Sequence, residues 1–62
     1  MTTTMVVARA KPQGLEYMVD GARGVWSEAA QSAARFESLR EATRAAMRLP
    51  SQQRAFALPL TH

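Results

Sequence analysis

The sequence predicts an α+β fold, with a three- to four-stranded antiparallel sheet packed on one main helix at about residues 39–49. Two features point to this class. Short apolar segments separated by turn sequences occupy the first half of the chain and return near its end, as in the strands of a sheet. Between them lies a helix-start motif, followed by helix-forming residues and then a proline. A chain of 62 residues has room for one small domain, residues 1–62.

The first predicted strand covers residues 3–10, a segment rich in β-branched residues. It ends in the sequence Lys11-Pro12-Gln13-Gly14. Proline at the second position and glycine at the fourth favour a type I turn there. A second strand is expected directly after this turn.

The second predicted strand, residues 15–20, places apolar and acidic side chains on opposite faces. Leu15, Tyr17 and Val19 alternate with Glu16 and Asp20, and Met18 alone breaks the pattern. The loop 20–24 contains two glycines and leads to a short third strand at 25–27, as in a hairpin. The first half of the chain is therefore expected to form a three-stranded meander.

The helix prediction depends on a capping box formed by Ser38 and Glu41. In this motif the serine hydroxyl accepts a hydrogen bond from the backbone N–H of Glu41, whose side chain reaches back to the helix start. Helix-forming residues continue to Leu49, and Pro50 ends the helix. At about 100° per residue one face is apolar and is expected to pack on the sheet; it consists of Leu39, Ala42, Ala45, Ala46 and Leu49.

Residues 54–60 are predicted to form the final strand, with Phe56, Leu58 and Leu60 on one face. Pro59 cannot donate a backbone hydrogen bond, so this strand is expected at a sheet edge or to fray there. The segment 28–36 allows two interpretations. It forms a short helix capped by Ser27, or a loop in which Phe36 fills the core; one short helical turn is preferred.

The spacing of several core and capping residues resembles that of small uncharacterised phage-type and bacterial β-β-α-β proteins. The resemblance covers about residues 15–60 and rests on Tyr17-x-Val19, Gly24-x-Trp26 and Ala34-x-Phe36-x-Ser38-x-x-Glu41-Ala42-x-x-x-Ala46, followed by a terminal strand. The additional first strand and the proline in the last strand depart from the pattern. The resemblance implies a phage-type accessory or host-modulating role, such as inhibition of a defence or regulatory complex, and no catalytic residues.

Residue types that carry chemistry are scarce in this chain. It has no cysteine, and its only histidine is the last residue, His62. Neither a nucleophile with a nearby base nor a metal site is predicted, so no catalytic, cofactor-binding or metal-binding residue is assigned and the protein is expected not to be an enzyme. The termini, residues 1–2 and 61–62, are expected to be disordered. With apolar runs of four residues at most and no signal sequence at its start, the chain is expected to be cytoplasmic.

Two other patterns have simple structural explanations. The loop 21–24 lacks the length and the Lys-Ser/Thr ending of a phosphate-binding loop. Glu37 and Glu41 lie four residues apart, a spacing that would bring two carboxylates close together on a helix. Helix capping and surface pairing with Arg40 and Arg44 account for them better than acid–base catalysis does.

All of the excess positive charge lies in the C-terminal half. Residues 1–34 hold three basic and three acidic side chains, whereas residues 35–62 hold five arginines and two glutamates. Three of these arginines recur every four residues along the predicted helix, opposite its apolar face. Guanidinium groups in such a row can bind carboxylates or phosphates, although a solvated helix face is the simpler interpretation. The candidate binding residues are Arg35, Arg40, Arg44, Met47, Arg48 and Arg54.

Met47 and the aromatic residues are each expected to lie either in the core or on the surface. Met47 lies at the border of the apolar and arginine faces, where it can anchor a partner or pack under the final strand or a loop. Because the chain has only four aromatic residues, Trp26 is expected to be mainly a core anchor and Phe36 wholly one. Tyr17 is expected to expose its hydroxyl group.

Three hypotheses about function follow. The preferred one is a small non-enzymatic protein that binds another protein through the arginine face or a strand edge. The second is nucleic-acid binding, in which the five arginines neutralise phosphates and Tyr17 or Trp26 stacks on a base. The third is a homodimer joined through the edge of the 3–10 strand. No cofactor and no membrane contact are expected in any of them.

Overall fold

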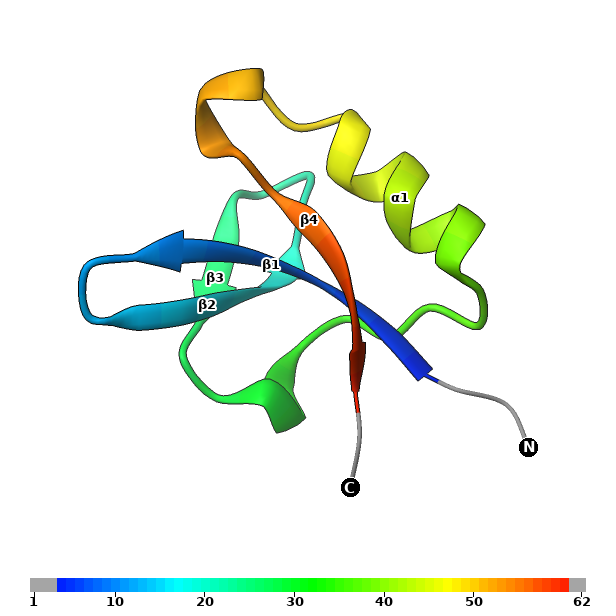
Figure 1. Ribbon diagram of the computed structural model, residues 1–62, viewed down its shortest axis with the longest axis horizontal. Helices are drawn as coiled ribbons and strands as arrows, with labels where there is room; N and C mark the ends of the chain where they lie inside the picture. Colours follow the sequence, from blue (N-terminus) through cyan, green and yellow to red (C-terminus); the bar gives the residue numbers. More distant parts are fainter. Residues whose placement is uncertain (1–3, 61–62) are drawn as a thin grey trace.

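The computed structural model describes residues 4–60, and it confirms the predicted fold class (Figure 1). A four-stranded antiparallel sheet packs against one α-helix. The disorder expected for residues 1–2 and 61–62 lies outside the described residues. In chain order the elements are β1 (Thr4–Lys11), β2 (Gly14–Asp20), β3 (Val25–Ser27), the 3₁₀ turn η1 (Ala30–Ser32), α1 (Leu39–Met47), the 3₁₀ turn η2 (Ser51–Gln53) and β4 (Phe56–Leu60).

The strands lie in the order β3-β2-β1-β4. Two successive hairpins place β1, β2 and β3 side by side, and the chain then returns through α1 to add β4 on the free side of β1. Ala8 of β1 lies opposite Tyr17 of β2 on one side and opposite Phe56 of β4 on the other. The strand expected to offer a free edge for dimerisation is therefore interior, and that route to a homodimer is closed.

The segment around Phe36 fills the space where β1 and β2 part. Phe36 and Met5 exchange two backbone hydrogen bonds, of 2.8 and 2.9 Å, and the N–H of Ala34 donates to the carbonyl of Met18. Only one 3₁₀ turn, Ala30–Ser32, precedes this segment. Each interpretation of residues 28–36 is thus correct in part, since a single turn forms and Phe36 packs against the core.

The core lies between α1 and the sheet. Met5 and Val7 of β1 and Met18 of β2 are buried there against Ala42 of α1. The alanines of α1 permit close approach to β1 and β4, the two strands that the helix contacts most. Leu39 differs from the prediction: it is 60% exposed, because the first residue of α1 projects beyond this contact.

The apolar face predicted for the second strand, with Leu15, Tyr17 and Val19, is not the face of β2 that packs against α1. Met18, which breaks the alternation in sequence, is the buried residue that faces α1, whereas Leu15 is exposed and Tyr17 and Val19 are half-buried. The physical reason is that both faces of this sheet carry apolar side chains. Alternation alone then shows which residues share a face, but not which face the helix covers.

The second face of the sheet is apolar as well. Val6 and Ala8 alternate with Met5 and Val7, so they point away from α1, and both are fully buried. The β1–β4 register places them opposite Leu58 and Phe56. In Figure 1, η1 lies on the side of the strands away from α1, and Ala33, which follows it, is also buried.

Both ends of the connection from α1 to β4 differ from the predicted boundaries. α1 ends at Met47 instead of Leu49, because the N–H of Leu49 bonds to Ala46, three residues back, as Pro50 approaches. The final strand begins at Phe56 instead of Arg54. Arg54 has a left-handed backbone, with φ 52°, which turns the chain out of η2 and into β4.

Candidate interaction surface

The arginine row on α1 is fully presented to solvent. Arg40, Arg44 and Arg48 are all exposed, on the side of the helix opposite Ala42. The helix starts where predicted, since the Oγ of Ser38 accepts a hydrogen bond of 3.2 Å from the N–H of Glu41. The cap fixes where the helix begins, and the packing of Ala42, Ala45 and Ala46 on the core fixes which face turns to solvent. The row is therefore a consequence of how α1 begins and packs.

No carboxylate forms an ion pair with the row within the described residues. The ion pairs of residues 4–60 join Arg9 to Glu16 and Arg23 to Asp20, and neither involves α1. The surface pairing expected between Glu41 and its neighbouring arginines is not formed, although Glu41, Arg44 and Arg48 border the same shallow groove beside Phe36. The helix thus offers several guanidinium groups without internal partners.

The two remaining candidate arginines do not extend this row. Ala34 and Phe36 both pack against the core under α1, so Arg35 between them points to the other side of the sheet. Arg54 is exposed and lies after η2, where it borders a groove between α1 and β4. The structure brings together Arg40, Arg44 and Arg48, places Arg54 near the end of α1, and separates Arg35 from them.

Met47 is the most exposed large apolar side chain of the described residues, at 78%. The expectation that it packs under the final strand is wrong, because α1 turns this side chain outward past β4. It lines a groove of about 450 Å³ together with Thr43 and Ala46 of α1 and Phe56 and Ala57 of β4. The apolar border of the arginine row is therefore accessible.

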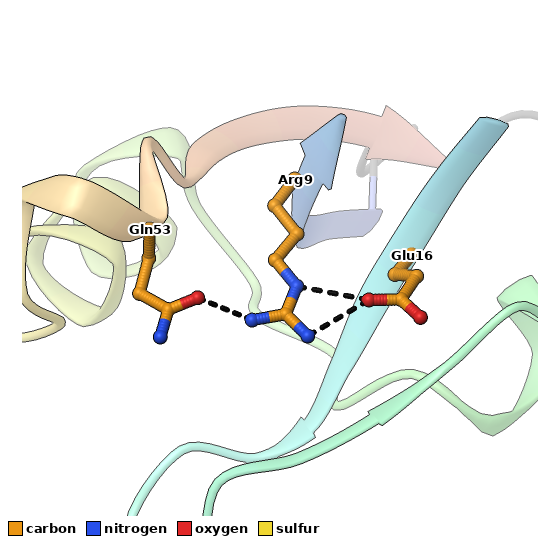
Figure 2. A network of polar contacts seen from close by, with 3 residues as sticks. All are labelled: Arg9, Glu16 and Gln53. Atoms are coloured by element: carbon orange, nitrogen blue, oxygen red, sulfur yellow. Dashed lines mark hydrogen bonds and ion pairs between the residues drawn. The ribbon is translucent and has the colours of Figure 1, made fainter. Parts of the chain in front are cut away.

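A polar cluster outside the predicted site residues surrounds Arg9, with Glu16 and Gln53 as its partners (Figure 2). The Nε and Nη2 atoms of Arg9 lie 2.9 and 2.8 Å from Oε1 of Glu16, and Nη1 donates to Oε1 of Gln53. The guanidinium group also lies 4.0 Å from the centre of the Trp26 ring. The side chain of Arg9 is only 15% exposed.

The pairing of Arg9 with Glu16 follows from the sequence of the turn between β1 and β2. A two-residue turn at Pro12-Gln13 pairs Lys11 with Gly14, and counting back two residues on each strand pairs Arg9 with Glu16. Gln53 lies 44 residues from Arg9, so no local pattern could have indicated that contact. Trp26 packs against the core as expected, and Arg9 occupies one face of its ring.

The described part of the chain contains no group of His, Cys, Asp or Glu side chains able to hold a metal ion. Within residues 4–60, no helix has the length and apolar character needed to cross a bilayer. Comparison of the chain with family models, curated proteins and solved structures gave no match. The resemblance to phage-type β-β-α-β proteins therefore stays a prediction.

Proposed function

We propose that this is a small non-enzymatic binding protein that recognises an acidic surface on another protein through Arg40, Arg44 and Arg48. The observation that carries the proposal is the exposed row of guanidinium groups without an ion-pair partner among residues 4–60. Arginine forms paired hydrogen bonds with carboxylates, and a partner would supply the missing counter-charge. A phage-type accessory role is the narrower form of the proposal and draws on the resemblance alone.

Two observations favour a protein partner over nucleic acid. The apolar side chain beside the row is Met47, a flexible anchor suited to protein contacts and unable to stack on a base. Trp26, the largest aromatic residue, has one ring face covered by Arg9. Binding to single-stranded nucleic acid normally uses open aromatic faces.

The test compares two double variants with the same change in charge. Arg40→Glu with Arg44→Glu reverses the charge of two of the three arginines in the row, and Lys11→Glu with Arg23→Glu reverses two exposed cations outside the helix. Affinity capture followed by mass spectrometry identifies a stoichiometric protein partner. The proposal requires that the row variant capture at least tenfold less of this partner than the wild type, while the control captures the same amount. Both variants must show the circular dichroism spectrum of the wild type.

A nucleic-acid titration forms the second arm. Duplex DNA and single-stranded RNA are titrated at about 50 mM salt, where phosphate contacts are strongest. Weak binding that both double variants reduce equally reflects net charge and leaves the proposal standing. Tight binding lost only in the row variant, with no captured protein, contradicts the proposal and assigns the row to phosphates.

A further inference from the structure

An uncharged strip runs along the open edge of the molecule, beside the arginine row. Its helical part consists of Leu39, Thr43 and Met47, which lie four residues apart and therefore form one line along α1. Leu39 and Met47 are 60% and 78% exposed. Its strand part consists of Phe56 and Ala57 of β4, which share a groove with Thr43 and Met47. These five residues are called the edge strip below.

The hydrogen-bond pattern shows which backbone groups of β4 face outward. Met5 uses both its N–H and its carbonyl on Phe36, so these groups point away from β4. Met5 and Val7 lie opposite Pro59 and Ala57, and neighbouring residues of a strand bond to opposite sides. Pro59 and Ala57 consequently direct their backbone polar groups to the open edge.

Of the two outward-facing residues of β4, Pro59 limits strand pairing and Ala57 can form it. Pro59 has no N–H to offer, and natural proteins use proline in this way to limit pairing between sheet edges. Ala57 keeps both an N–H and a carbonyl, and neither has a backbone partner within residues 4–60. Every side chain of β4, FALPL, is apolar, so no charge protects the edge.

The geometry suits a second copy of the same chain. In an antiparallel pair of β4 strands related by a two-fold axis at Ala57, the two Ala57 residues exchange two hydrogen bonds and Pro59 lies off the axis. Thr43 and Met47, which adjoin Ala57 in the groove, meet their counterparts on the same face of the joined sheet. Phe56 and Leu58 of one copy then lie opposite Leu58 and Phe56 of the other.

Charge permits this occupant at the strip itself. The chain has a net charge of +3, so two copies repel each other, and the repulsion is smallest where the contacting surfaces carry no charged side chain. The arginine row lies on the neighbouring line of α1 and stays in solvent. Arg54, which borders the groove, is three residues from the axis, so the two copies of it are roughly 20 Å apart and screened by salt.

We propose that two copies of this chain associate through the edge strip, β4 against β4, into a two-fold dimer with a continuous eight-stranded sheet and both arginine rows facing solvent. Such a dimer covers the exposed Met47, which lines the groove beside Ala57, and adds buried apolar area to a small domain. The proposal is independent of what the arginine row binds.

The test measures dimerisation by sedimentation equilibrium up to about 200 μM, a range that covers weak homodimers. Ala57→Pro removes the one outward-facing N–H of β4, as described over Phe56–Leu60. Thr43→Lys places a charge next to the axis on each copy. Ala22→Lys is the matched control, since it adds the same charge to an exposed turn between β2 and β3, at the far side of the sheet.

The proposal requires a wild-type dimer that the Ala22→Lys variant retains and that Ala57→Pro and Thr43→Lys each weaken at least tenfold. Thermal melting of each variant shows whether the monomer still folds. If Ala57→Pro does not fold, the effect of Thr43→Lys on dimerisation decides the test. A wild-type monomer across the whole range overturns the proposal, as does a dimer that neither edge variant weakens. If the wild type is a monomer and Thr43→Lys loses a captured protein partner, the edge strip binds that partner and the dimer proposal is wrong. The row variant Arg40→Glu/Arg44→Glu is expected to dimerise normally, which separates this proposal from the proposed function.

Discussion

The guanidinium group of Arg9 lies 4.0 Å from the centre of the Trp26 ring and joins three separate elements around it. Arg9 belongs to β1, Trp26 to β3 and Gln53 to η2, and Glu16 of β2 neutralises the charge. α1 packs mainly on β1 and β4 and makes few contacts with β3, the strand of Trp26. The side chain of Arg9 therefore covers one face of the Trp26 ring.

Replacing Arg9 with alanine is expected to lower the free energy of unfolding by about 1–3 kcal/mol. The change removes a part-buried ion pair, the contact with Gln53, the cation–π contact and the apolar stem over the ring. Arg9→Lys is expected to fall between wild type and Arg9→Ala, because lysine keeps the charge but lacks the planar fork whose separate nitrogens contact Glu16 and Gln53. Urea denaturation followed by Trp26 fluorescence measures both.

Arg23→Ala is the matched control for Arg9. Arg23 also pairs with a carboxylate, at 3.7 Å from Asp20, but its side chain is 83% exposed. Exposed pairs of this kind contribute little, so a loss within about 0.5 kcal/mol is expected. Equal effects of the two substitutions would show that Arg9 does not stabilise the end of the sheet.

Ser38→Ala is expected to destabilise the protein by about 1 kcal/mol, because the N–H of Glu41 loses its acceptor at the start of α1. Ser51→Ala provides the control at the start of η2, where no side chain caps the turn. Thermal unfolding by circular dichroism compares the two. A Ser51→Ala variant as unstable as Ser38→Ala would contradict the role assigned to the cap.

Gly24→Ala is expected to cost about 1 kcal/mol through the backbone alone. Gly24 has φ +68°, and an added Cβ would meet no atom within 4 Å, so only the left-handed conformation opposes the change. Gly24→Asn should therefore be milder, since asparagine tolerates this region. If alanine and asparagine destabilise the protein equally in chemical denaturation, the backbone explanation is wrong.

Leu39→Ala distinguishes the predicted position of this residue from the observed one. A leucine in the core costs about 2–5 kcal/mol when truncated to alanine. Because Leu39 is 60% exposed, we expect a loss below about 1 kcal/mol in the monomer. Leu49→Ala, at a position packed against the core, should destabilise more. The comparison is made by denaturation at a protein concentration low enough to keep the chain monomeric.

Local chemistry accounts for the parts of the molecule that the sequence predicted correctly. The hydroxyl of Ser38 and the ring of Pro50 act on their immediate neighbours, so the start and the approximate end of α1 follow from a few adjacent residues. Turn residues act at the same range, and the two-residue turn at Pro12-Gln13 also sets the pairing of Arg9 with Glu16. The arginine row follows directly, since its members lie on one helix.

The sequence by itself determined the four strands, the single helix and the exposure of Arg40, Arg44 and Arg48. Only the tertiary structure decided which face of the sheet α1 covers, why Met18 is buried while Leu15 is exposed, and that β1 is interior while β4 forms an edge. The reason is that both faces of the sheet are apolar. Periodicity then shows which residues share a face, but it does not show which of the two faces α1 covers. That choice depends on contacts between distant segments, such as Phe36 with Met5 and Gln53 with Arg9, which no local pattern records.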